Sequence, residues 1–200
     1  MWVKRTSIRF LAILFLISAV YFSGCDIYKS EESHISGIDK TVCEQFSDSV
    51  FTPVRSALLT DYYADAYDAQ LTSMMPGFVD SLLKDSVFVE QNTEKAYELT
   101  LGGNDTTYLA VKNAAGTLTL FATDIVQVNL LKQDGKSVKL ADDKMPLSTI
   151  SGCTELTKGG VIEPIIKLRL AYDLDTQGNY LIQMIKVEQT KSSTFKLSLQ

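Results

Sequence analysis

The chain has 200 residues, a formal net charge of −5 and 46% hydrophobic residues. This length suits one domain, and the apolar content excludes disorder along the whole chain because it is enough to form a core. The acidic balance argues against binding to nucleic acid and against electrostatic attachment to anionic lipid.

The first 25 residues contain the clearest pattern in the chain. Basic residues lie at positions 4, 5 and 9, an uncharged run covers 10–22, and Ser23-Gly24 follows. A basic start, a short apolar core and a small-residue exit are typical of a secretory signal peptide. The run is shorter than the roughly 20 residues that a membrane-spanning helix needs. The basic flank orients the rest of the chain outside the cytoplasm.

The tetrad Phe22-Ser23-Gly24-Cys25 resembles the lipobox of bacterial lipoproteins. In that family a peptidase cuts before the cysteine, which is then acylated on its sulfur and on its new amino group. The resemblance implies that 1–24 is a signal peptide and that Cys25 holds fatty acids such as palmitate. The protein would then be attached to the inner or outer membrane of a bacterial cell envelope. The alternatives are an uncleaved N-terminal anchor and ordinary secretion with Cys25 as a spare thiol.

Lipidation of Cys25 would leave Cys43 and Cys153 as the two thiols of the mature chain. An even number of cysteines outside the cytosol favours a disulfide, and two separate buried thiols are the alternative. The loop that the bond closes would span most of the domain. From the entropy that such a loop removes from the unfolded chain, the disulfide would stabilise the fold by at most about 4–5 kcal/mol.

Residues 25–40 are polar after the cysteine and show little periodicity, which predicts a lipidated cysteine followed by a flexible tether. His34 lies in this tether and is the only histidine. A two-histidine metal site is therefore excluded. We expect residues 41–200 to form a single globular domain.

Residues 43–84 are predicted to be helical. Thr52-Pro53 indicates the start of a main helix over 54–74, and Pro76-Gly77 indicates its end. The apolar residues that recur every four positions, as on one face of a helix, are Phe46, Val50, Val54, Leu58 and Tyr62.

Two acidic patterns are weak candidates for binding a metal ion. Asp61, Asp65 and Asp68 would share one face of the predicted helix, and hard cations prefer oxygen ligands. A solvated acidic face is the simpler interpretation. Residues 173–178 partly match a calcium-binding loop, but Met184 stands where that loop needs a glutamate. We therefore interpret 173–178 as a turn and expect no metal or other cofactor.

From residue 87 to 200 the hydrophobic period changes from near 3.6 to 2, which predicts strands. Short turns between them indicate antiparallel neighbours, and the turn-like stretch 141–160 is expected to be held by Cys153. The expected fold class is α+β, with the helical segment packed on a mainly antiparallel, strongly bent sheet or open barrel of about eight strands. The expected strands are 97–101, 107–112, 118–120, 126–130, 137–140, 166–172, 179–188 and 195–199.

The sequence contains no nucleophile elbow, no phosphate-binding loop and no paired metal motif. Without a suitable histidine it also lacks an ordinary Ser-His-Asp site, so we expect no enzyme. The leading hypothesis is a non-catalytic envelope lipoprotein that presents a binding or structural domain to a protein or polymer partner. One alternative is a lipocalin-like carrier of a small apolar ligand, since eight strands can enclose one small molecule. A hydrolase that uses acidic residues is a third possibility, for which no pair stands out.

Overall fold

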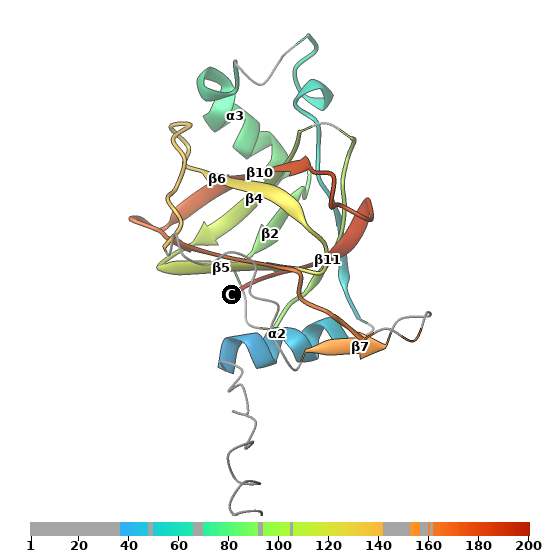
Figure 1. The fold of residues 1–200 in the computed structure, drawn as a ribbon. Helices are drawn as coiled ribbons and strands as arrows, with labels where there is room; N and C mark the ends of the chain where they lie inside the picture. The colour runs from blue at the N-terminus through green and yellow to red at the C-terminus, as the bar shows by residue number, and fades with distance from the viewer. Residues whose placement is uncertain are drawn as a thin grey trace, which may run out of the picture. The chain divides into compact units, whose positions relative to one another are not determined.

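Two β-sheets that pack face to face and two α-helices dominate the structure (Figure 1). The structure is a computed structural model that describes residues 37–47, 50–65, 70–91, 94–104, 106–141, 153–156, 160 and 162–200. These residues belong to one compact unit, Ile35–Gln200.

The five-stranded sheet has the order β1 (Thr52–Arg55), β3 (Tyr97–Thr100), β11 (Thr194–Leu199), β5 (Thr117–Ala122) and β9 (Leu168–Asp173). The four-stranded sheet has the order β2 (Phe88–Glu90), β4 (Thr107–Ala114), β10 (Gly178–Lys186) and β6 (Val126–Leu131). A separate hairpin pairs β7 (Thr154–Leu156) with β8 (Ile162–Pro164). The α-helices among the described residues are α2 (Gly37–Ser47) and α3 (Leu71–Lys84), and a short 3₁₀ turn covers Leu59–Asp61.

The α+β class is confirmed, and the sheets are mainly antiparallel, with parallel pairing between β1 and β3 and between β2 and β4. The expected single bent sheet or open barrel is not confirmed, because the described strands form two separate larger sheets. The space between these sheets contains apolar side chains from all nine strands, including Leu99, Leu120 and Ile182. This shared interior is the main core.

A helix covers the outer face of each sheet. On β4, Leu109 and Val111 point into the space between the sheets, whereas Tyr108 and Ala110 pack against α3. Because both faces of the four-stranded sheet are covered, its central strands are apolar on both sides. The expected strand 179–188 corresponds to β10, which lies between β4 and β6. On the other side of the molecule, α2 packs on the five-stranded sheet around Phe121.

The prediction that short turns join neighbouring strands is wrong for the two larger sheets. The turn at Gly116 passes from β4 in one sheet to β5 in the other, and residues 174–177 pass from β9 to β10 in the same way. A tight turn reverses the chain whether the next strand joins the same sheet or the facing one. Turn residues therefore predicted the strands but not their partners.

The predicted helix over 54–74 is also wrong. Thr52–Arg55 forms strand β1, which pairs in parallel with β3. The backbone N–H of Thr52 bonds to Ala96, just before β3, and that of Ser56 bonds to Thr100 of β3. Pro53 therefore faces the free edge, where its missing N–H costs nothing. Pro76 does not end a helix but lies inside α3. It removes one backbone hydrogen bond from a helix that buries five apolar side chains.

Two chain segments bridge the sheets along their sides. Ala57, just after β1, exchanges backbone hydrogen bonds of 2.9 and 2.8 Å with Tyr108 of β4. On the opposite side, the N–H of Val138 bonds to Leu130 of β6, and the N–H of Ala141 bonds to Ala171 of β9. The predicted strand 137–140 is thus a crossing segment held by isolated bridges. These segments cover backbone edges that would otherwise be open.

Tyr172 gives the fold a dependence on alkaline pH. Its side chain is 2% exposed, and burial raises the pKa of its phenol to about 12. The pKa of Tyr172 in the folded protein lies above the ordinary value near 10. The contribution of its protonated phenol to the free energy of unfolding is therefore complete below pH 10 and is lost as the pH rises toward 12. We expect Tyr172→Phe to remove a stability loss of about 2–3 kcal/mol across that interval. Denaturant titrations of the wild type and Tyr172→Phe at pH 8, 10 and 11.5 would check this. An equal fall in the free energy of unfolding of both proteins between pH 10 and 11.5 would contradict it.

Candidate functional site

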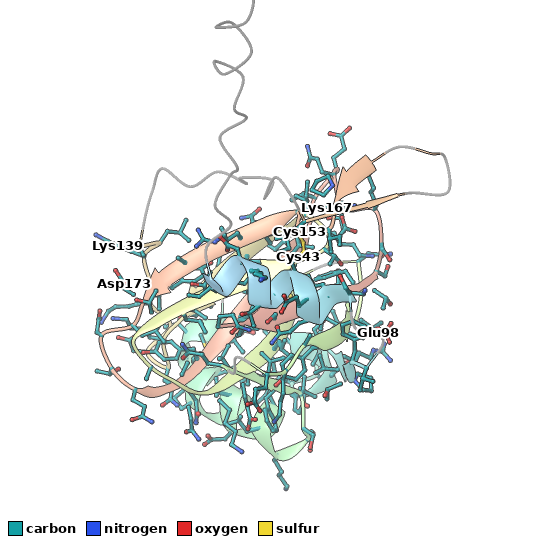
Figure 2. The ribbon with its side chains drawn as sticks, turned by 90° about the horizontal axis from the view of Figure 1, so that it is seen from below. Cys43, Glu98, Lys139, Cys153, Lys167 and Asp173 are labelled. Carbon is teal, nitrogen blue, oxygen red and sulfur yellow. A yellow bond between two sulfur atoms is a disulfide. The ribbon has the colours of Figure 1, made fainter. Side chains whose placement is uncertain are left out.

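The contact between α2 and the five-stranded sheet combines a disulfide, an ion pair and a lysine, and we call it the α2 dock. It consists of α2 together with Phe121, Cys153, Arg169, Lys196 and Ser198. Figure 2 shows α2 lying across the sheet, with Cys43 beside Cys153. The described chain begins with α2, the N-terminal element of the α2 dock.

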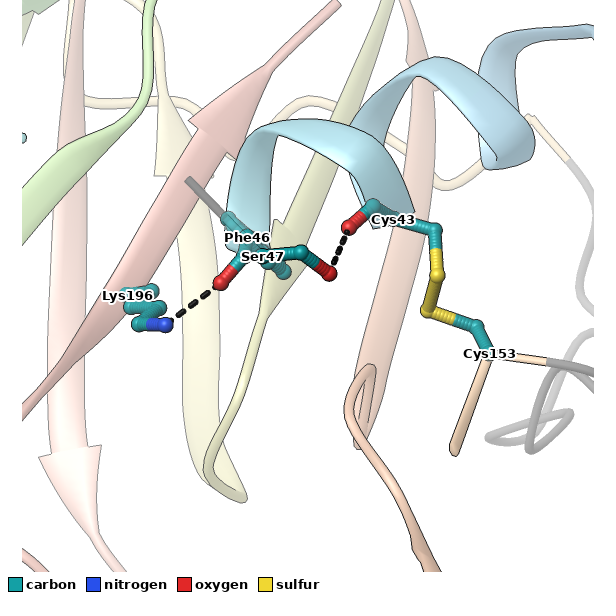
Figure 3. Close-up of a disulfide and its surroundings, with 5 residues drawn as sticks. All are labelled: Cys43, Phe46, Ser47, Cys153 and Lys196. Carbon is teal, nitrogen blue, oxygen red and sulfur yellow. Dashed lines mark hydrogen bonds between the residues drawn. A yellow bond between two sulfur atoms is a disulfide. The ribbon is translucent and has the colours of Figure 1, made fainter. Parts of the chain in front are cut away.

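The predicted pairing of Cys43 with Cys153 is confirmed (Figure 3). The two Cα atoms are 5.8 Å apart, and 110 positions separate the residues in sequence. Cys153 is 1% exposed, and its carbonyl accepts a hydrogen bond of 2.9 Å from the N–H of Ile165. The bond therefore attaches α2 to the hairpin segment that leads into β9.

Charged side chains of the sheet contact both ends of α2. In its first turn, Asp39 Oδ1 lies 3.0 Å from Arg169 Nε, and the side chains of this ion pair are 13% and 18% exposed. In the last turn, the Lys196 ammonium donates to the carbonyl of Phe46 (Figure 3). The same ammonium lies 4.7 Å from the centre of the Phe51 ring. An acidic group near the N-terminus and a cation at the C-terminus both complement the helix dipole.

The sheet face below α2 is partly polar. Ser198 Oγ donates to Gln45 Oε1 at 2.9 Å, and Gln200 Nε2 donates to the same oxygen at 3.3 Å. The apolar part of the dock is small and centres on Val42, Phe46 and Phe121. The α2 dock therefore holds the helix through a few specific contacts as much as through apolar burial.

The lipobox residues Phe22, Ser23 and Gly24, with Cys25, lie outside the described residues, as does His34. The described chain begins at Gly37, where α2 starts within the predicted tether 25–40.

The acidic face expected from Asp61, Asp65 and Asp68 depended on a helix that is not present. Asp61 ends the 3₁₀ turn and accepts a hydrogen bond of 2.8 Å from the N–H of Leu58. Asp65 has a backbone φ of 64°, and Asp68 is not among the described residues. In the described ranges, no group of three or more His, Cys, Asp or Glu side chains could hold a metal ion.

The calcium-like stretch 173–178 contains the turn at 174–177 between β9 and β10, and a turn is what the sequence predicts there. Its carboxylates bind protein groups: Asp173 Oδ1 accepts from Thr117 Oγ1 at 3.1 Å, and Asp175 pairs with Lys132. These residues also line a surface pocket of about 350 Å³ next to the crossing segment 137–141.

A second surface pocket, of about 610 Å³, lies beside the segment just after β1 that bridges the two sheets. Its polar lining includes Arg55, Asp61, Tyr62 and Asp85. Partial burial and, to a smaller extent, a hydrogen bond to Asp85 raise the pKa of the Tyr62 phenol to about 12. The pocket is lined by a positively charged donor, Arg55, and by the carboxylates of Asp61 and Asp85. Such a lining suits a polar ligand rather than an apolar one.

Sequence reasoning found the disulfide but missed the rest of the α2 dock. Asp39 and Arg169 are 130 positions apart, and no local pattern links them. The alternation in 166–172 and 195–199 does place Arg169 and Lys196 on the face opposite the core. It contains no information on which helix covers that face.

Comparison of the sequence with models of known protein families and with curated protein sequences finds no match. Among the described helices, none is both long and apolar enough to cross a membrane.

Proposed function

We propose that this protein is a bacterial envelope lipoprotein that is attached to a membrane through acylated Cys25 and presents a non-catalytic domain outside the cytoplasm. The observation that carries the proposal is the order of a basic start, a short apolar run and Phe22-Ser23-Gly24-Cys25. One acyl chain binds membranes only marginally, whereas several chains on one residue give stable attachment.

The Cys43–Cys153 disulfide supports an exported location, because such bonds persist in oxidising compartments. The partner would be a protein or polymer of the envelope. The carrier alternative needs free space between the sheets, and large buried side chains such as Leu118, Tyr180 and Phe195 occupy that space. This packing supports a presenting domain over a carrier of an apolar ligand.

The anchor is tested by Cys25→Ala in the organism that makes the protein. We expect the variant protein to be lost from the membrane fraction and to take up no labelled palmitate, because the acylated sulfur is gone. Ser30→Ala, five positions further on, is the matched control and should stay membrane-bound. Unchanged fractionation and labelling of Cys25→Ala, or a free thiol at Cys25 in the mature wild-type protein, would contradict the proposal.

A further inference from the structure

The helix α2 buries little of its own surface. Of its eleven residues, Val42 and Phe46 are buried, whereas α3 buries five of fourteen. An isolated helix of fewer than about 12–15 residues is marginal in water, so α2 depends on its contacts with the sheet to stay folded.

Two of the polar contacts that hold α2 have a smaller net effect on stability than their number suggests. The Asp39–Arg169 pair is shielded from water, and the cost of removing two charges from water offsets much of their attraction. The hydrogen bond between Ser198 and Gln45 replaces bonds that both groups make with water when α2 is free. Apart from the main chain, the disulfide is the one covalent link between α2 and the rest of the fold among the described residues.

We infer that the Cys43–Cys153 bond sets how far the domain extends from the membrane, because it keeps α2 on the five-stranded sheet. This inference rests on the proposed lipid attachment at Cys25. With α2 docked, residues 26–36 connect the lipid to the domain and reach at most about 40 Å. With α2 released, the next fixed element is β1, so residues 26–51 reach at most about 90 Å.

A dithiol reductant is the class of molecule that would release α2. Cys43 is half-buried and Cys153 is buried, so the reductant thiolate attacks the sulfur of Cys43. That attack forms a mixed disulfide, and Cys153 leaves as a thiolate that takes up a proton. The second thiol of the reductant then displaces Cys43, so the protein disulfide is reduced and the dithiol is oxidised.

Hydrogen exchange followed by mass spectrometry tests the inference on the full-length protein. The samples are the oxidised wild type, the wild type folded first and then treated with dithiothreitol, and the Cys43→Ser/Cys153→Ser variant. Lys40→Gln, which removes an exposed ion pair on α2, is the matched control. We expect the peptide covering α2 to exchange at least about a hundredfold faster than the peptide covering β10 in both samples that lack the bond.

In the oxidised wild type and in Lys40→Gln, α2 should remain protected. Exchange of α2 and β10 at the same rate without the bond would overturn the inference, because α2 would then leave the sheet only when the whole domain unfolds. Unfolding of the entire domain on reduction would overturn it as well. Neither outcome depends on lipid, so fractionation of Cys25→Ala reports separately on the proposed function.

Discussion

Gly102→Ala is expected to lower the free energy of unfolding by about 2–4 kcal/mol. A Cβ atom on Gly102 would lie 2.2 Å from the carbonyl oxygen of Ser56 and 3.1 Å from its carbonyl carbon. Ser56 cannot easily move, because its N–H bonds to Thr100 at 3.0 Å and its hydroxyl accepts a bond from the N–H of Gly102. The next residue, Ala57, is bonded to β4. The added methyl group therefore strains the segment that joins the two sheets.

The matched control for this change is Gly178→Ala, where an added Cβ meets no atom within 4 Å. We expect that variant to unfold within about 0.5 kcal/mol of the wild type. Urea denaturation of the three proteins measures the difference. Equal midpoints for Gly102→Ala and Gly178→Ala would show that the approach of Ser56 to Gly102 is not a constraint of the fold.

Phe78→Ala should cost about 3–5 kcal/mol, the largest loss that we expect from a single core truncation here. Phe78 is fully buried on α3, and its ring makes edge contacts with Tyr62, Tyr63 and Tyr108 at centroid distances of 5.5, 6.1 and 5.3 Å. Removing the ring leaves a cavity between α3 and the four-stranded sheet, and the paired strand below cannot collapse into it.

Phe88→Ala makes the same chemical change on edge strand β2, where the side chain is partly exposed. Its expected cost is less than half that of Phe78→Ala, because less surface is lost from the core and solvent can fill the gap. Thermal or urea unfolding of both variants compares the two sites. A larger loss at Phe88 would mean that α3 contributes little to the stability of the domain.

The strands of the second half were predictable because each covers one face of the core with every second residue. Phe195, Leu197 and Leu199 alternate with polar residues, and β11 has these residues on the interior face. The disulfide was predictable from the number of cysteines that lipidation would leave. These inferences depend on a local residue pattern or on an even number of cysteines, and both can be read directly from the sequence.

The remaining features depend on contacts between distant segments. Apolar residues at Val50, Val54 and Leu58 fit a helix, but residues 52–55 gain more by pairing with β3, some 45 positions away. The same limit applies to the α2 dock, because the ion pair of Asp39 with Arg169 needs the whole fold to bring its partners together. Pairing between distant segments overrides the secondary-structure propensity of each segment, and no neighbouring residues in the sequence indicate that pairing.

The strand order also affects how the chain reaches its native state. Within the described residues, no strand of the two larger sheets bonds to the strand next to it in sequence, and the late strands β10 and β11 occupy interior places in both. Few native strand pairs can therefore form early from neighbouring segments, which predicts slow acquisition of structure, in milliseconds to seconds. Until residues 178–199 are available to pair, both sheets lack an interior strand, so the apolar segments made earlier stay exposed for longer.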